Sequence, residues 1–155
     1  MSHMPVDHPL RGLYRGLTVL TGLAAAGYGA VALAQASDHS FFDRAGESVL
    51  GLKANAAAGL LWLIIGVVTL ITSLVGRNLD AKVNIVLGPV LWVVGTIALC
   101  LIRTSANVLA ASVMTVIVLY IVGAILLTGS LYGSVSRGRA VSDRPIAARE
   151  SVSVR

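Results

Sequence analysis

The side chains that could do chemistry gather in one polar stretch between two apolar segments. This stretch holds Asp38, His39, Asp43 and Glu47. Carboxylates beside a histidine can bind a metal ion or exchange protons with a substrate. One histidine is few for a metal site, and such a set on a polar loop is usually solvated surface, so we predict no metal site here. The enzyme alternative is a reaction on lipid or quinone at headgroup level, with these four residues as acid or base.

The other reactive residue types are scattered along the chain. Cys100 is the single cysteine, so it has no internal disulfide partner, and we interpret it as a small apolar packing residue. His3 and His8 precede the first apolar segment and His39 follows it, which puts them on opposite sides of a membrane. The glycines lie inside apolar segments and not in a phosphate-binding loop. We therefore expect no catalytic residue, no metal and no obligatory cofactor, and we expect the chain not to be an enzyme.

Four apolar segments, residues 16–36, 54–76, 83–102 and 108–135, contain no Asp, Glu, Lys, Arg or His. A helix needs ~20 residues to cross a hydrocarbon core of about 30 Å, and each segment reaches that length. The chain is 56% hydrophobic and 12% charged, whereas soluble domains have about 25% charged residues. The sequence predicts an all-α integral membrane bundle of four transmembrane helices over residues 16–135. Residues 1–15 form an N-terminal segment and residues 136–155 a basic tail, which we expect to be disordered in isolation.

The basic residues predict the orientation of the chain in the membrane. The side that carries both termini and the loop 77–82 would hold nine of them, and the side with loops 37–53 and 103–107 would hold three. The nine are Arg11, Arg15, Arg77, Lys82, Arg137, Arg139, Arg144, Arg149 and Arg155. The positive-inside rule places both termini in the cytoplasm. We expect the chain to be a multi-pass protein of the plasma membrane. The net charge of +5 then favours contact with anionic phospholipid and not with nucleic acid.

Small residues recur at helical spacing within the apolar segments and indicate close helix packing. They are Gly22, Ala26, Ala30 and Ala34 in the first segment, Gly59 and Gly66 in the second, Gly88 and Gly95 in the third, and Gly129 and Gly133 in the fourth. We predict that these residues contact other helices of the bundle or of a partner chain. Because loop 77–82 is short, we expect Gly66 and Gly95 to approach each other across an antiparallel helix pair. Pro89, behind Gly88, predicts a tolerated kink, with a hinge as the alternative.

The outer polar stretch also has a helical pattern. In 41–52, Phe42, Ala45, Val49 and Leu52 fall on one helical face, which predicts a short helix lying in the membrane interface, although Gly46 and Gly51 weaken the pattern. We expect Phe41 and Phe42, together with Tyr132 near the other face of the membrane, to act as interface anchors.

Four aromatic residues lie deeper in the segments, namely Tyr28, Trp62, Trp92 and Tyr120. Their polar atoms need hydrogen-bond partners in hydrocarbon, and Thr69, Thr96, Ser112 and Thr115 are candidates. We interpret the four rings as interhelical packing with polar ties. The alternative is the lining of a groove for bound lipid or quinone.

The chain resembles a family of small four-span actinobacterial membrane proteins with no assigned function. The resemblance rests on an Arg-flanked first helix, on Phe41-Phe42-Asp43, and on Leu50-Gly51-Leu52-Lys53-Ala54-Asn55 before a glycine-containing second helix, and it covers about residues 10–135. Members of that family often carry histidines in the second helix, where this chain has Ala56, Ala57 and Ala58. A histidine-dependent role is therefore not expected here. In size, topology and basic tail, the chain is also similar to small subunits that accompany the actinobacterial cytochrome bcc–aa3 respiratory supercomplex.

Together these features predict a non-catalytic accessory subunit of a larger membrane protein complex. The resemblance implies a respiratory oxidase supercomplex as the specific assembly, with other membrane subunits as partners. The alternative is a homo-oligomeric channel or carrier for small neutral solutes, which the Gly129/Gly133 pair, Pro89 and the helix threonines would favour.

Overall fold

The computed structural model describes residues 9–75 and 78–134, and it contains four long helices and one β-hairpin. The elements are α1 Arg11–Gln35, β1 Glu47–Val49, β2 Leu52–Ala54, α2 Ala56–Val75, α3 Leu79–Leu101 and α4 Val113–Gly133. Each helix is long and apolar enough to cross a membrane. The predicted all-α architecture with four membrane-spanning helices is confirmed, and the chain is a multi-pass membrane protein. The predicted basic tail 136–155 lies outside the described residues.

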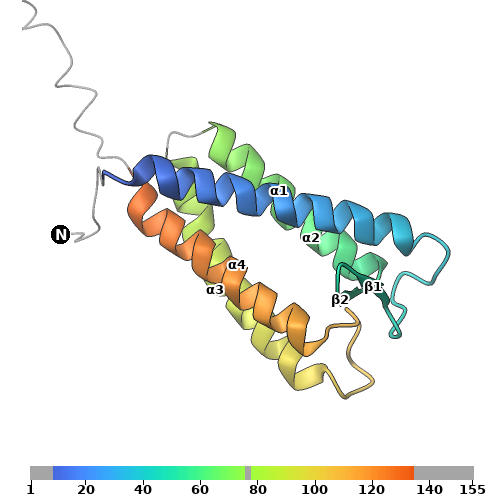
Figure 1. Cartoon of the computed structure of the whole chain (residues 1–155). Coiled ribbons are helices and arrows are strands. Elements are labelled where there is room, and N and C mark those ends of the chain that lie inside the picture. Colours follow the sequence, from blue (N-terminus) through green and yellow to red (C-terminus); the bar gives the residue numbers. More distant parts are fainter. Residues whose placement is uncertain (1–8, 76–77, 135–155) are drawn as a thin grey trace, which may run out of the picture.

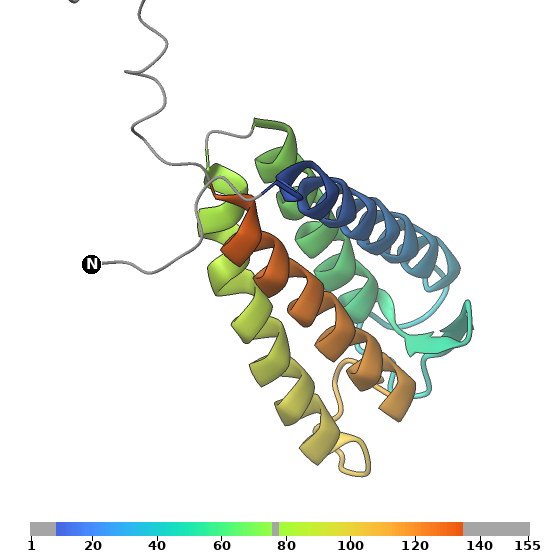
Figure 2. The same ribbon diagram turned by 60° about the vertical axis from the view of Figure 1, so that its left-hand side comes forward.

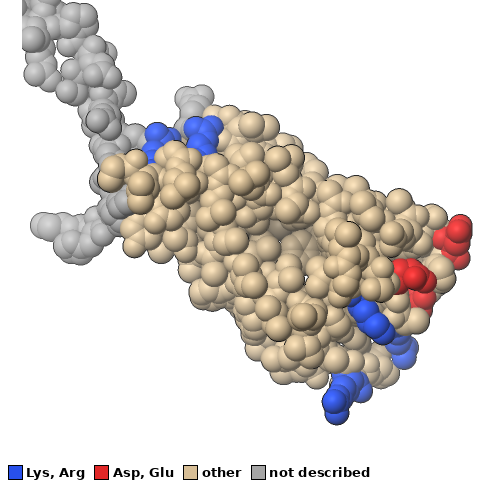
Figure 3. All heavy atoms as spheres, viewed as in Figure 1, with Lys and Arg blue, Asp and Glu red and all other residues tan. Residues whose placement is uncertain are grey.

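The helices form two closely packed pairs, α1 with α2 and α3 with α4 (Figure 2). The start of α1, the end of α2, the start of α3 and the end of α4 lie at one end of the bundle, and the hairpin and the α3–α4 loop lie at the other (Figure 1). We call these the terminal end and the hairpin end. Charged side chains gather towards the two ends of the face shown in Figure 3 and leave an uncharged belt between them.

The segment 41–52 does not form the predicted interfacial helix. Its second half enters an antiparallel hairpin in which Glu47 pairs with Ala54 and Val49 with Leu52. The turn residues Leu50 and Gly51 have φ of 51° and 83°, the pattern of a two-residue type I′ turn. Gly46 also has a positive φ, of 59°. Left-handed backbone at three positions interrupts a right-handed helix, so the glycines outweigh the apolar periodicity.

Local hydrogen bonds decide where α4 begins. The fourth apolar segment starts at residue 108, but the helix starts at Val113 because Asn107 holds the preceding residues in a loop. The Asn107 amide donates to Ala111 O at 3.0 Å, and its Oδ1 accepts from Ala111 N at 2.9 Å. Ser112 then caps the helix in a reciprocal pair with Thr115. In α3, by contrast, the helix continues through Pro89, whose side chain faces outwards.

Candidate functional site

Helix α1 presents two faces that are rich in small residues, and only one of them is buried. The buried face consists of Thr18, Gly22, Ala25, Gly29 and Ala32, at alternating spacings of four and three residues. At its crossing with α2, a Cβ on Gly29 would lie 2.6 Å from Gly59 O and 2.8 Å from Leu63 Cα. The backbones of α1 and α2 are therefore in direct contact, as small residues allow in membrane helices.

Two of the four small residues predicted to form a packing stripe on α1, Gly22 and Ala26, belong to the α1–α2 contact. A Cβ on Gly22 would lie 3.0 Å from Leu70 Cγ, and Ala26 packs against Gly66. Ala30 and Ala34 are instead exposed. A helix has 3.6 residues per turn, so a four-residue repeat rotates by about 40° at each step and leaves the contact after two or three steps. Alternation of three and four stays on one face, which is why Gly29 and Ala32 replace Ala30 and Ala34.

The outer face of α1 remains uncovered by the described residues. A Cβ placed on Gly12, Gly16 or Gly27 would meet no atom within 4 Å, apart from atoms of the adjacent residues and of the helix backbone. Ala30 and Ala34 lie on the same side of α1 as these glycines. The spacings between consecutive members of the set, in residues, are each close to a whole number of helical turns. We call Gly12, Gly16, Gly27, Ala30 and Ala34 the outer small face.

The second helix pair has its own close crossing, between Gly88 and Gly123. A Cβ on Gly88 would lie 2.8 Å from Gly123 O, and one on Gly123 would lie 2.8 Å from Gly88 O. Gly95 faces Leu119 and Tyr120 of α4. The expected approach of Gly66 to Gly95 is therefore wrong: Gly66 contacts α1 and Gly95 contacts α4. Sequence spacing identified Gly88 and Gly95 but missed Gly123, which has no glycine partner at GxxxG distance.

The predicted glycine pair of α4 lies at its contact with α1. Gly129 lies against the Thr18 side chain, and Gly133 O accepts a hydrogen bond from Arg11 Nε at 3.0 Å. Close by, the ring of Tyr132 stacks on Tyr14, with 5.2 Å between centroids. These residues are engaged within the chain at the terminal end.

The polar loop between α1 and α2 shows how its reactive side chains are used. His39 and Glu47 approach to 3.6 Å (Nε2 to Oε1), and both side chains are about half exposed. Asp43 Oδ1 accepts from Ala45 N at 3.0 Å. Within 9–75 and 78–134, no three His, Cys, Asp or Glu side chains are grouped so that they could hold a metal ion. Phe41 and Phe42, predicted as anchors, are exposed and pack edge to face at 4.8 Å.

Asn55 links this loop to the rest of the hairpin end, and sequence reasoning did not single it out. Its Nδ2 donates to Asp43 O at 2.9 Å and to Val108 O at 2.8 Å, while its Oδ1 accepts from Ala58 N at 2.9 Å. One buried side chain thus caps the start of α2 and binds the loop before β1 and the α3–α4 loop to it. An asparagine directly before an apolar helix is a common N-cap, and that was the available signal.

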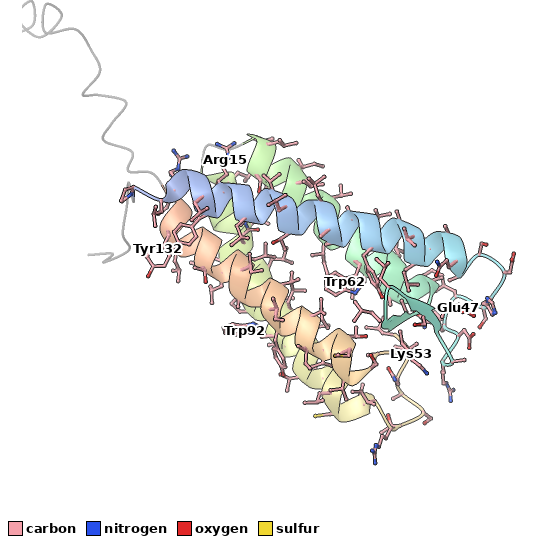
Figure 4. All side chains as sticks on the ribbon, viewed as in Figure 1. Arg15, Glu47, Lys53, Trp62, Trp92 and Tyr132 are labelled. Carbon is pink, nitrogen blue, oxygen red and sulfur yellow. The ribbon has the colours of Figure 1, made fainter. Side chains whose placement is uncertain are left out.

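Two of the four deep aromatic residues are tied into the α3–α4 pair. Trp92 Nε1 donates to Tyr120 O at 3.0 Å, and the Tyr120 hydroxyl pairs with Thr96 Oγ1 at 2.8 Å. This is interhelical packing with polar ties, with Thr96 among the partners considered from the sequence. Trp92 is labelled at the α3–α4 pair in Figure 4, and its indole ring lies against Gly123 of α4.

The other two aromatic residues line an apolar cavity of about 350 Å³ between α1, α4 and the hairpin. Trp62 points into the space between the helices in Figure 4, and the surface is hollowed there in Figure 3. Tyr28 packs edge to face on Trp62 at 5.8 Å, and its buried hydroxyl has no hydrogen-bond partner. The remaining lining residues are Thr21, Ala24, Ala25, Leu50, Leu52, Val118, Val122 and Ile125. The cavity can hold an apolar group.

No protein-family model, curated protein or solved structure matches this chain.

Proposed function

We propose that the protein is a non-catalytic accessory subunit that binds other membrane proteins through the outer small face of α1. The observation that carries this proposal is the second set of small residues on a helix whose first set is already buried against α2. Lipid tails are as apolar as leucine, so association in a membrane depends on close backbone approach, which glycine and alanine permit. Leu20 and Leu23, exposed between the glycines, would pack into the surface of the partner.

The contrast with α3 supports this choice of face. The exposed side of α3 carries Val86, Val90, Val93 and Ile97. Such branched side chains fill space well against lipid tails but hold a second helix backbone away. Small and large residues are thus distributed differently on the two exposed helices, and the distribution favours α1 as the partner surface.

As partner we propose a respiratory oxidase assembly of the bcc–aa3 type, on the strength of the resemblance in size, topology and basic tail. The protein would reside in the plasma membrane with both termini in the cytoplasm, because the basic residues favour that orientation. Anionic phospholipid would contact the basic residues of the terminal end, such as Arg11, Arg15 and Lys82.

Affinity purification from gently solubilised native membranes tests the proposal. We expect wild-type protein to comigrate with other membrane subunits on a native gel, and Gly27→Leu with Ala30→Leu to abolish this while the free protein keeps its thermal stability. The control is Val90→Leu with Val93→Leu on the exposed side of α3, which should leave copurification intact. Wild-type protein that runs as a free monomer would overturn the proposal. Self-association with flux of small neutral solutes into liposomes would support the channel or carrier instead.

A second candidate function is the binding of lipid or quinone in the cavity between α1 and α4. It is favoured by the volume of about 350 Å³ and by the apolar lining of this cavity. Mass spectrometry of the protein in mild detergent should detect the bound molecule. Val118→Trp, which fills the cavity, should remove it, and Ile117→Trp on the exposed side of α4 should not. Equal retention by both variants would contradict this function.

A further inference from the structure

The core at the terminal end of the bundle is polar, unlike the apolar core in its middle. Around the centre, Trp62, Ile65, Leu91, Leu119 and Leu126 pack together. Towards the terminal end, every helix instead contributes buried polar side chains. These are Thr18, Thr69, Ser73, Asp80, Asn84 and Ser130, each at most 6% exposed. We call these six residues the polar layer.

Contacts between the helices place the polar layer within the last two turns of the bundle at its terminal end. Thr18 of α1 lies against Gly129 of α4, and the Arg15 guanidinium donates to Ser73 O of α2 at 2.5 Å. Gly88 of α3 packs against Leu127 of α4. Asn84 is one turn before Gly88 and Ser130 about one turn after Leu127, so the antiparallel α3–α4 pair sets them side by side. Asp80 lies in the first turn of α3, and Ser73 lies in the last turn of α2.

Four oxygen atoms of the polar layer have no hydrogen-bond partner. They are Thr69 Oγ1, Ser73 Oγ, Asp80 Oδ1 and Asn84 Oδ1, all inaccessible from the surface. The first two residues are four apart on α2 and the last two are four apart on α3, so each pair shares one helix face. Ser130 Oγ, by comparison, donates to Leu127 O of its own helix at 2.7 Å. Unmet buried polar atoms are costly, and four of them from two adjoining helices indicate a shared missing partner.

We propose that the polar layer binds a monovalent cation such as Na⁺ through these four oxygens. A set made only of carboxylate, amide and hydroxyl oxygens suits hard cations. When ionised, Asp80 supplies one negative charge, so a monovalent ion leaves the site neutral, whereas a divalent ion would leave an unpaired charge in a low-dielectric interior. Arg15 is occupied by the carbonyls at the end of α2. Across residues 9–75 and 78–134, the ion pair is His39–Glu47, and no basic side chain of these residues pairs with Asp80.

Thermal unfolding of the purified protein in detergent tests the site directly. We expect the Tm to rise saturably with NaCl relative to choline chloride at equal ionic strength, by about 5–10 °C once the ion exceeds its Kd about 100-fold. Asp80→Asn should abolish the difference, and Thr69→Val with Ser73→Ala should reduce or abolish it. Thr21→Val removes a hydroxyl outside the layer that bonds its own helix, and it should respond as wild type does.

Several results would contradict a Na⁺ site in the polar layer. No difference between NaCl and choline chloride in wild type, or an equal rise in Asp80→Asn, would overturn it, and so would stabilisation by CaCl₂ or MgCl₂ alone. If Asp80→Asn does not fold, the Thr69/Ser73 variant carries the test by itself. An Arg77→Gln variant checks for a counter-ion inside the chain: a Na⁺ response confined to that variant would also overturn the proposal. The result of this test does not depend on the proposed subunit function, because thermal unfolding is measured on the isolated protein.

Discussion

Ala26 of α1 lies directly against Gly66 of α2: a Cβ on residue 66 would fall 2.6 Å from Ala26 Cα and 2.7 Å from Ala26 Cβ. The neighbouring contact of Gly29 with Gly59 and Leu63 continues this seam towards the hairpin end. Four residues beyond Ala26, Ala30 is exposed. Helix α1 therefore carries small residues both at its contact with α2 and on its exposed side.

Substitution of the two alanines by leucine should have opposite effects on the isolated protein. Ala26→Leu forces a side chain into the Gly66 backbone, and overpacking of this kind costs about 1–3 kcal/mol. Ala30→Leu adds a side chain on an exposed face and should leave the free energy of unfolding within about 0.5 kcal/mol of wild type. Unfolding in a detergent of constant composition measures both. Equal stability of the two variants would mean that α1 is rotated relative to the arrangement described above.

Gly27 and Gly29 form a second matched pair, two residues apart. A Cβ at residue 29 would clash with the α2 backbone, whereas one at residue 27 meets open space. Gly29→Ala should therefore destabilise the protein. Gly27→Ala should stabilise it by up to about 1 kcal/mol, the helix propensity difference between the two residue types. Thermal melts of both variants beside wild type would show the opposite signs, and a loss of stability in Gly27→Ala would contradict the open face.

Asn55→Ala should be the most damaging single change in the hairpin end. It removes the cap of α2 and leaves Asp43 O and Val108 O without their side-chain donor. We expect a loss of about 2–3 kcal/mol, from a cap worth about 1 kcal/mol plus the unmet carbonyls. Asn55→Asp keeps the capping oxygen but not the Nδ2 donor, so its Tm should fall between those of wild type and Asn55→Ala. An Asp variant as unstable as the alanine variant would show that the two loop contacts dominate.

Leu50 is strained at the tip of the hairpin. It holds a φ of 51° and is 83% exposed, although left-handed backbone costs an ordinary residue about 1–2 kcal/mol. Leu50→Asn creates the Asn-Gly sequence that type I′ turns favour, and it should raise the free energy of unfolding by about 0.5–1 kcal/mol. Unfolding in detergent provides the measurement. Destabilisation would instead indicate that the apolar contacts of Leu50 at the cavity outweigh its backbone strain.

Sequence alone determined the number of membrane-spanning helices and their approximate limits. Each segment, such as 83–102, is apolar along its whole length, and the transfer of a helix into hydrocarbon depends on the sum of its residues and little on their order. Sequence also indicated that glycine and alanine make the helix contacts. It could not identify their partners, because a glycine contact depends on which backbone lies opposite.

Tertiary structure decided the rest. The alternation of Gly22, Ala25, Gly29 and Ala32 became the buried face of α1, since a four-residue repeat drifts around a helix of 3.6 residues per turn. Positive φ at Gly46, Leu50 and Gly51 made a hairpin from a stretch with helical periodicity. Asp80 falls within the expected loop 77–82 and Asn84 at the start of the apolar segment 83–102, yet both are buried. A polar residue near a membrane boundary can face water, lipid or the bundle interior, and only the rotation and depth of its helix select among them.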